Sequence, residues 1–169
     1  GNYEIIIGTR EGMSIRFSES DVRSMGRGAM GVRGIRLDKT DTVIGMEVAE
    51  PKTKKTLLTV CELGFGKRTD LDEYRHQNRG GSGVITIKAT ERNGAVVGIY
   101  LVENKDHLMV MTEKGKIIRM PCKTLRVISR NTQGVRLVRM EEGDKIASVE
   151  PVIDDGVEGG DLKLIEEKK

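Results

Sequence analysis

The sequence contains three copies of one unit of about fifty residues. Two markers recur at intervals of 52 and 51 residues. They are a single glycine, at Gly12, Gly64 and Gly115, and a Gly-Val pair that begins at Gly31, Gly83 and Gly134. A fixed period of this length is typical of repeat architectures, in which each copy is a small structural unit stacked on its neighbours. We therefore predict one domain, residues 1–152, built from tandem units at 3–51, 55–103 and 106–152.

Each copy has the pattern of four short strands. An apolar run leads to the glycine marker and a second run follows it, which predicts a hairpin. A polar segment then precedes a third strand, such as 31–37 or 135–140. A final strand, such as 95–102, follows a turn that in the second copy is Asn93-Gly94. Because helical spacing of apolar residues is missing, the pattern predicts an all-β, propeller-like fold with four-stranded blades.

The number of copies limits the overall shape. Three blades cannot close a ring, because propellers typically contain about 4 to 8 blades. We therefore expect an open arc or part of a larger, six-blade disc, and Gly1 and Asn2 favour a piece of a longer chain. Residues 153–169 contain six acidic residues and three lysines, which predicts a flexible acidic tail. The formal net charge is +3, so removing the tail's −3 leaves +6 for residues 1–152.

Composition argues against several classes of site. Aromatic residues make up 3% of the sequence and Trp is absent, which disfavours a carbohydrate site and stacking platforms for single-stranded nucleic acid. Cys61 and Cys122 have no Cys or His at zinc spacing, so we predict reduced, buried thiols and no metal site. No apolar run approaches the roughly 20 residues of a membrane span, and no leader opens the sequence. These observations predict a cytoplasmic protein with no membrane partner.

Three sets of equivalent positions in the repeat carry a basic residue in every copy, and each set is called a register here. They are Arg16, Arg68 and Arg119; Arg27, Arg79 and Arg130; and Arg36, Lys88 and Arg139. Four further cations, Lys67, Lys116, Arg33 and Arg136, lie near the same turns. A cation repeated on a repeated scaffold forms a periodic positive stripe, and arginine can bind phosphate with two hydrogen bonds. We predict that these residues bind the backbone of double-stranded DNA, with little dependence on base sequence because no recognition helix is expected.

A structural interpretation of the same arginines stays open. An arginine can link one blade to the next through a carboxylate or a backbone carbonyl. We expect this role most at Arg27, Arg79 and Arg130, because each lies beside a tight turn. For Arg16, Arg68 and Arg119 we predict instead that replacing all three by alanine weakens DNA binding with little loss of thermal stability.

The sequence predicts no catalytic residue, because no combination of nucleophile, base and orienting group emerges. Gly26, Gly28 and Gly31 match a dinucleotide-binding pattern, but the segment leads into a predicted strand and not into a helix. The match is therefore interpreted as accidental.

Three strings resemble the C-terminal domain of the DNA gyrase A subunit. They are residues 64–69 (GFGKRT), 90–94 (TERNG) and 130–135 (RNTQGV), in the order and at the positions of the later blades of that domain. The resemblance covers residues 3–152. It implies a β-pinwheel, a propeller-like disc whose blades exchange strands with their neighbours and whose rim carries DNA. The basic registers would then face the duplex.

The segment 77–83 resembles a box of that family that is tied to DNA wrapping and lies in an earlier blade. The positions retained here are Gln77, Arg79, Gly80, Gly81 and Gly83. Asn78 and Ser82 replace two cations of the box. The resemblance implies a weaker equivalent of the box in a late blade.

The resemblance also implies a place in a larger enzyme. The chain would bend and wrap DNA and so support ATP-dependent negative supercoiling by a bacterial type IIA topoisomerase of two A and two B subunits. The catalytic tyrosine, the ATP and the Mg²⁺ would lie elsewhere, so this chain is expected to hold no cofactor. Tyr3, Tyr74 and Tyr100 are then blade residues and not nucleophiles. The alternatives are the equivalent domain of topoisomerase IV and a protein-interaction scaffold.

Overall fold

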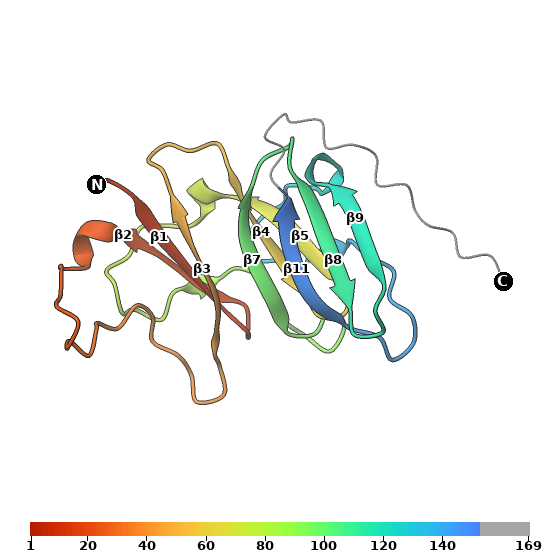
Figure 1. Ribbon diagram of the computed structural model, residues 1–169, viewed down its shortest axis with the longest axis horizontal. Helices are drawn as coiled ribbons and strands as arrows, with labels where there is room; N and C mark the ends of the chain where they lie inside the picture. Colours follow the sequence, from red (N-terminus) through yellow and green to blue (C-terminus); the bar gives the residue numbers. More distant parts are fainter. Residues whose placement is uncertain (153–169) are drawn as a thin grey trace.

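The computed structural model describes residues 1–152, and the predicted acidic tail lies outside the described residues. Figure 1 shows antiparallel sheets packed side by side. The first has the order β3 (Val43–Ala49), β1 (Glu4–Thr9), β2 (Met13–Ser18) and β6 (Val84–Ile85). The second has the order β7 (Val96–Val102), β4 (Thr56–Cys61), β5 (Phe65–Asp70) and β10 (Val135–Arg136). The third has the order β11 (Ile146–Val152), β8 (His107–Thr112) and β9 (Ile117–Pro121).

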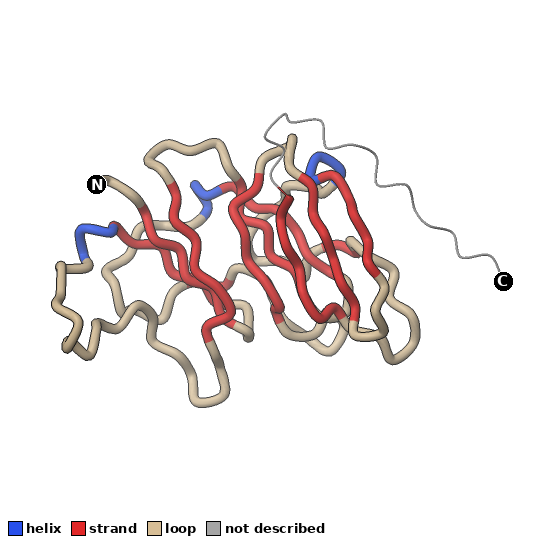
Figure 2. Tube along the Cα trace, in the orientation of Figure 1, coloured by secondary structure: helices blue, strands red, loops and turns tan. Residues whose placement is uncertain are grey.

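A short 3-10 helix follows the hairpin of each copy. These helices are η1 (Glu19–Asp21), η2 (Leu71–Glu73) and η3 (Cys122–Thr124). Figure 2 shows that strands and connecting loops make up almost all of the rest of the described chain. The all-β, propeller-like fold predicted from the repeat is confirmed.

The glycine markers form the hairpin turns. Gly12 and Gly64 have φ of 88° and 83°, a left-handed conformation that favours glycine. A Cβ at Gly12 would lie 2.3 Å from the carbonyl oxygen of Ile87, and one at Gly64 would lie 2.4 Å from that of Val138. Both carbonyls belong to the following copy, so each turn is also a contact between copies.

Strands are exchanged between neighbouring copies. The second copy supplies β6, which pairs with β2 of the first sheet through Met13 opposite Ile85. The third copy supplies β10, which pairs with β5 of the second sheet through Phe65 opposite Arg136. The strand exchange implied by the family resemblance is therefore present.

The prediction of four strands in every copy holds for the second and third copies and is wrong for the first. The predicted third strand at 135–140 is reduced to β10, and the prediction of a strand at 31–37 is wrong. Residues 22–42 instead form a long connection without strand (Figure 2). The reason is physical: a third strand forms by pairing with the hairpin of the preceding copy, and no hairpin precedes the first copy within residues 1–152. The third sheet correspondingly has three strands, and β9 is its edge.

The core lies between the sheets. Strand β4 is buried at every residue because a neighbouring sheet covers each of its faces. Leu57 and Cys61 pack with Ile6 of the first sheet. Leu58 and Val60 point the other way and pack with residues of the third sheet such as Leu108. Removing this apolar surface from water holds the copies together as a continuous stack.

The helices within the described part of the chain are too short and polar to cross a membrane.

Candidate nucleic-acid interface

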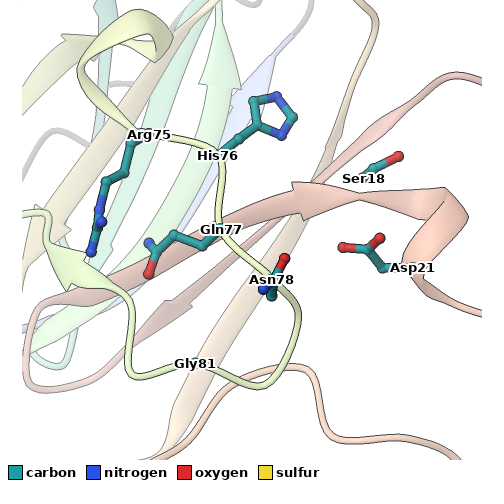
Figure 3. A pocket seen from close by; sticks show the side chains of 7 residues that line it. All are labelled: Ser18, Asp21, Arg75, His76, Gln77, Asn78 and Gly81. Atoms are coloured by element: carbon teal, nitrogen blue, oxygen red, sulfur yellow. The ribbon is translucent and has the colours of Figure 1, made fainter.

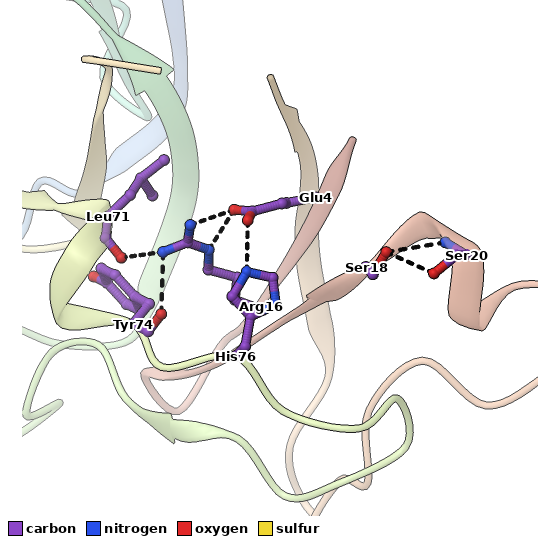
Figure 4. Close-up of polar contacts among 7 residues, drawn as sticks. All are labelled: Glu4, Arg16, Ser18, Ser20, Leu71, Tyr74 and His76. Atoms are coloured by element: carbon purple, nitrogen blue, oxygen red, sulfur yellow. Dashed lines mark hydrogen bonds and ion pairs between the residues drawn. The ribbon is translucent and has the colours of Figure 1, made fainter. Parts of the chain in front are cut away.

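Strand β2 places Arg16 at the contact between the first and second copies (Figure 4). Its Nη1 donates hydrogen bonds to the backbone carbonyls of Leu71, at 2.5 Å, and Tyr74, at 3.2 Å. The guanidinium also forms an ion pair with Glu4, whose second carboxylate oxygen lies 2.5 Å from Nε2 of His76. Only 12% of the Arg16 side chain is exposed. Arg16 therefore links two copies.

Arg68 has the same role one copy later. Its Nε donates to Oγ1 of Thr56 at 2.7 Å, and its Nη1 donates to Oδ1 of Asn104 at 2.7 Å and to the carbonyl of Cys122 at 3.0 Å. Leu71 and Cys122 occupy the same register, so the two arginines bind equivalent carbonyls. Arg68 is 3% exposed.

Arg119, the third member of this register, is exposed on β9. No following copy lies within residues 1–152 to supply the carbonyl that Arg16 and Arg68 bind. The register is thus built for contact between copies, and the guanidinium groups of Arg16 and Arg68 are used within the protein and not for the predicted contacts with DNA.

Lys67 lies in the interior, although it was predicted to contact DNA. Its Nζ donates to the carbonyls of Ser129, at 2.7 Å, and Arg130, and to Oγ1 of Thr132 at 3.1 Å. Burial lowers the pKa of Lys67 to about 8. The hydrogen bonds show that Lys67 holds the 129–132 loop of the third copy against β5.

Arg79 and Arg130 also link copies, as the structural interpretation predicts. Nε of Arg79 donates to the carbonyl of Asp21 at 3.1 Å, and its Nη1 donates to that of Arg33 at 2.5 Å. Arg130 makes the equivalent bonds to the carbonyls of Glu73, at 3.3 Å, and Ile85. Arg27, at the same register of the first copy, is exposed.

The remaining predicted cations are exposed. They are Arg27, Arg33, Arg36, Lys88, Lys116, Arg119, Arg136 and Arg139. Lys116 forms an ion pair with Glu141 at 2.6 Å, and this hydrogen bond raises the pKa of Lys116.

One of the three basic registers is exposed in every copy, namely that of Arg36, Lys88 and Arg139. The backbone N–H of Arg36 donates to the carbonyl of Gly81, and that of Lys88 donates to the carbonyl of Thr132, each at 2.8 Å. These bonds fix the backbone on which the cations stand. Within the described residues, the three side chains form no ion pair, so their charges face solvent.

A second group of cations surrounds Phe65, which sequence reasoning did not single out. The guanidinium carbons of Arg92 and Arg136 lie 5.0 Å and 5.5 Å from the centroid of the Phe65 ring. Buried Asn93 donates from Nδ2 to the carbonyls of Lys88, at 2.9 Å, and Gln133, at 3.0 Å. Two exposed arginines therefore lie together where the exchanged strand β10 reaches the glycine-turn end of the second sheet.

The three copies match one family model in turn. Residues 3–50, 55–103 and 106–153 match the model of the DNA gyrase C-terminal domain, described as a beta-propeller. The chain belongs to the DNA gyrase C-terminal domain family.

Curated gyrase A subunits are similar to this chain over a small part of their length. The DNA gyrase A subunit of Haloquadratum walsbyi is 48% identical over 160 residues, which cover 94% of this chain and 19% of that protein. The DNA gyrase A subunit of Staphylococcus epidermidis is 45% identical over 152 residues, which cover 90% of this chain and 17% of that protein. The chain spans about a fifth of the length of these relatives.

Solved structures of two related domains share the fold. The C-terminal domain of DNA topoisomerase IV superposes with a TM-score of 0.83 at 25% identity, over 90% of this chain and 47% of that one. The DNA gyrase A C-terminal domain superposes with a TM-score of 0.80 at 25% identity, over 90% of this chain and 51% of that one. The fold is thus common to both enzymes, whereas the curated relatives at 40–48% identity are gyrase A subunits.

The degenerate gyrase-type box contacts the first copy. The N–H of Gly80 donates to the carbonyl of Gly34 at 2.7 Å, and the carbonyl of Gly81 accepts from Arg36 at 2.8 Å. Gln77 lies in a shallow hollow beside these bonds (Figure 3). The hollow is lined by Ser18, Asp21, Arg75, His76, Gln77, Asn78 and Gly81. The box therefore fixes the backbone under Arg33 and Arg36.

Sequence reasoning also missed a register that shapes the turns. Oδ1 of Asp41 accepts from the N–H of Glu11 at 2.9 Å, and Oδ1 of Asp144 accepts from that of Lys114 at 3.2 Å. Asn93 occupies the same register, and all three residues are buried. Their spacing of 52 and 51 residues was a signal that could have found them.

Reactive side chains of the described region have structural roles. Cys61 and Cys122 are free and buried, and burial raises the pKa of Cys61 to about 12. The hydroxyl of Tyr74 lies 2.6 Å from Oγ1 of Thr86, and that of Tyr100 donates to the carbonyl of Val149. These contacts hold strands together.

Proposed function

We propose that this domain binds the backbone of duplex DNA on its exposed basic surface and bends it, with little dependence on base sequence. The observation that carries the proposal is the exposed register of Arg36, Lys88 and Arg139. Because the copies stack at a regular interval, this register presents cations at regular intervals along the outside of the stack. Arg33, Arg136, Arg27, Arg119 and Lys116 are exposed as well, and Lys116 is paired with Glu141.

Phosphate contacts can offset the cost of bending. Smooth bending of a site of 20–30 base pairs by 40–90° costs on the order of 1–6 kcal/mol. Each Lys or Arg that neutralises a phosphate releases counterions, which favours binding at low salt. A cationic surface with several phosphate contacts along the stack is therefore suited to hold a bent duplex.

The activity of the whole enzyme is part of the proposal. The relatives bear the name of the DNA gyrase A subunit. We infer that this domain acts within a cytoplasmic, nucleoid-associated gyrase of two A and two B subunits, where bent or wrapped DNA supports ATP-dependent negative supercoiling. The catalytic tyrosine and the ATPase belong to other parts of that assembly, which is where ATP and Mg²⁺ would bind.

The second candidate is the equivalent role in topoisomerase IV, which the TM-score of 0.83 with that domain supports. The two candidates share the same contact with duplex DNA. A comparison of supercoiling with decatenation, after the domain is grafted onto each enzyme, separates them.

The test replaces the three cations of the exposed register and leaves the arginines that link the copies unchanged. In the Arg36→Gln, Lys88→Gln and Arg139→Gln triple variant, we expect weaker binding to a random-sequence duplex. The slope of log K against log salt should fall by up to about 2.7, roughly 0.9 for each lost phosphate contact. Donor and acceptor labels on the duplex ends report whether the bend is lost as well.

The matched control is Lys52→Gln, Lys54→Gln and Lys105→Gln. These lysines lie in the connections before β4 and β8, away from the glycine turns. Equal effects of the two triple variants would contradict a specific surface. Wild-type protein that binds acidic protein but no duplex at low salt would favour the interaction scaffold instead.

A further inference from the structure

Phe65 holds two arginines at the junction between the second and third copies. Its ring is 6% exposed and lies at the start of β5. Arg136 reaches it from the exchanged strand β10, and Arg92 reaches it from the turn before β7. Both guanidinium groups therefore lie against the same ring.

The arrangement leaves positive charge unbalanced. Both arginines are exposed, and neither forms an ion pair within residues 1–152. Like charges held at one ring repel one another, and the attraction of each to the shared ring opposes that repulsion. An anion between or across the two guanidinium groups would remove the remaining repulsion.

The positions of both arginines are fixed before any ligand arrives. Nη1 of Arg92 lies 3.4 Å from Oε1 of Gln133, and Asn93 binds the carbonyl of Gln133 at 3.0 Å. Gly134 and Val135 then lead directly into Arg136. The turn that carries Arg92 is thus tied to the segment that carries Arg136, and preorganisation of this kind lowers the entropic cost of binding.

We propose that Arg92 and Arg136, positioned by Phe65, form a two-arginine clamp for the phosphodiester backbone of a duplex. This rests on the proposed function and names the contact at which the backbone is held most firmly. Guanidinium groups suit phosphate oxygens because their paired N–H donors match the spacing of those oxygens. Phe65 does not stack on a base, because its ring is buried beneath the arginines.

The clamp occurs at one junction between copies. The register of Phe65 is occupied by Met13 in the first copy and Lys116 in the third, and that of Arg92 by Thr40 and Gly143. Neither of those copies has a ring with two cations. The duplex should therefore be anchored at the junction between the second and third copies and held more loosely on either side.

The experiment compares Arg92→Gln with Arg136→Gln, singly and together, in wild-type and Phe65→Met backgrounds, using duplex binding titrated over salt. The double variant should lower the slope of log K against log salt by about 1.8, for two lost phosphate contacts. The effects of the two single substitutions on the binding free energy should be non-additive when Phe65 is present and additive when Met occupies that position. Phe65→Met keeps both charges, so its affinity should fall several-fold with the slope nearly unchanged.

The charge-matched control is Lys52→Gln with Lys54→Gln, at the opposite end of β4 from Phe65. Equal slopes for the control and the arginine pair would overturn the clamp while leaving DNA binding by the domain in place. Absence of duplex binding by the wild-type chain would overturn the proposed function itself. If Phe65→Met fails to fold, the exposed arginine pair still decides, because neither of those side chains is buried.

Discussion

Arg68 donates three hydrogen bonds inside the protein, whereas Arg119, at the same register, is exposed. The difference comes from the following copy, whose backbone carbonyl at Cys122 accepts from Arg68. Both arginines also bind backbone carbonyls of the following copy, and acceptors of this kind leave no mark in the sequence. The repeat therefore predicted where cations recur but could not show which of them are used for links between copies.

We predict that Arg68→Met destabilises the domain by roughly 2–4 kcal/mol, because buried acceptors lose a charged donor. Arg119→Met should change the free energy of unfolding by less than about 0.5 kcal/mol, as for an ordinary surface position. Urea unfolding of both variants measures the difference. Similar losses of unfolding free energy in the two variants would contradict a link between copies through Arg68. They would support the expectation from sequence that this register matters little for stability.

Lys67 should make stability depend on pH. Burial lowers its pKa to about 8, from the ordinary value of 10.5. Between these values the unfolded chain keeps a proton that the folded chain has released, so this group makes the folded state more stable as pH rises. The free energy of unfolding of wild type minus that of Lys67→Met should therefore increase from pH 8 to 10.

Cys61, whose raised pKa acts in the opposite direction above its ordinary value of 9.0, is present in both proteins, so the difference between them removes most of its contribution. A difference that stays constant across this range would show that the amine is not buried as described.

At the scale of the element, the hairpins could be predicted from the sequence and the exchanged strands could not. A hairpin needs a glycine with φ near 83° between two apolar runs, and both features are local. The exchanged strands β6 and β10 form because a hairpin of the preceding copy is available to pair with them. Residues 31–37 have a similar local pattern but have no such partner in the part of the chain that the structure describes, so the pattern alone could not distinguish them from β6 and β10.

The glycine turns provide a matched pair of substitutions. Gly64 and Gly115 both have φ of 83°, but a Cβ at Gly64 would lie 2.4 Å from the carbonyl of Val138, and one at Gly115 would meet no atom within 4 Å. We predict that Gly115→Ala costs about 1–2 kcal/mol from backbone conformation alone. Gly64→Ala should cost a further 1–3 kcal/mol or so, because it also forces the next copy away. Equal losses of stability in the two variants, measured by thermal or urea unfolding, would show that the third copy moves away from Gly64 at little cost.

At the scale of the whole molecule, stacking of the copies decides which residues meet. Phe65, Arg92 and Arg136 come from three separate segments and converge only because β10 crosses to the second sheet. The cation at Arg136 was predicted from its place near a turn, but its pairing with Arg92 required the exchange. The row of Arg36, Lys88 and Arg139 was predictable because it follows the period alone.

The edge of β9 has a consequence for self-association. Within residues 1–152, it lacks the pairing that β6 and β10 give to the other sheets, and residues 31–37 lack a hairpin to pair with. By the registers of the second sheet, Ile117 of one molecule would face Val32 of another, and Lys116 would face Arg33. Like charges opposite each other across a strand pair disfavour pairing, and salt screens them.

Head-to-tail association of the purified chain should therefore increase with ionic strength, while its affinity for DNA falls. Two molecules joined in this way contain as many blades as a closed propeller typically needs, so the assembly should stop at a ring of two rather than grow into a filament. Sedimentation across a salt series measures it, and a chain that stays monomeric at every salt concentration would show that the edge is protected. The same positive charges that draw the chain to a polyanion would thus also keep its copies apart.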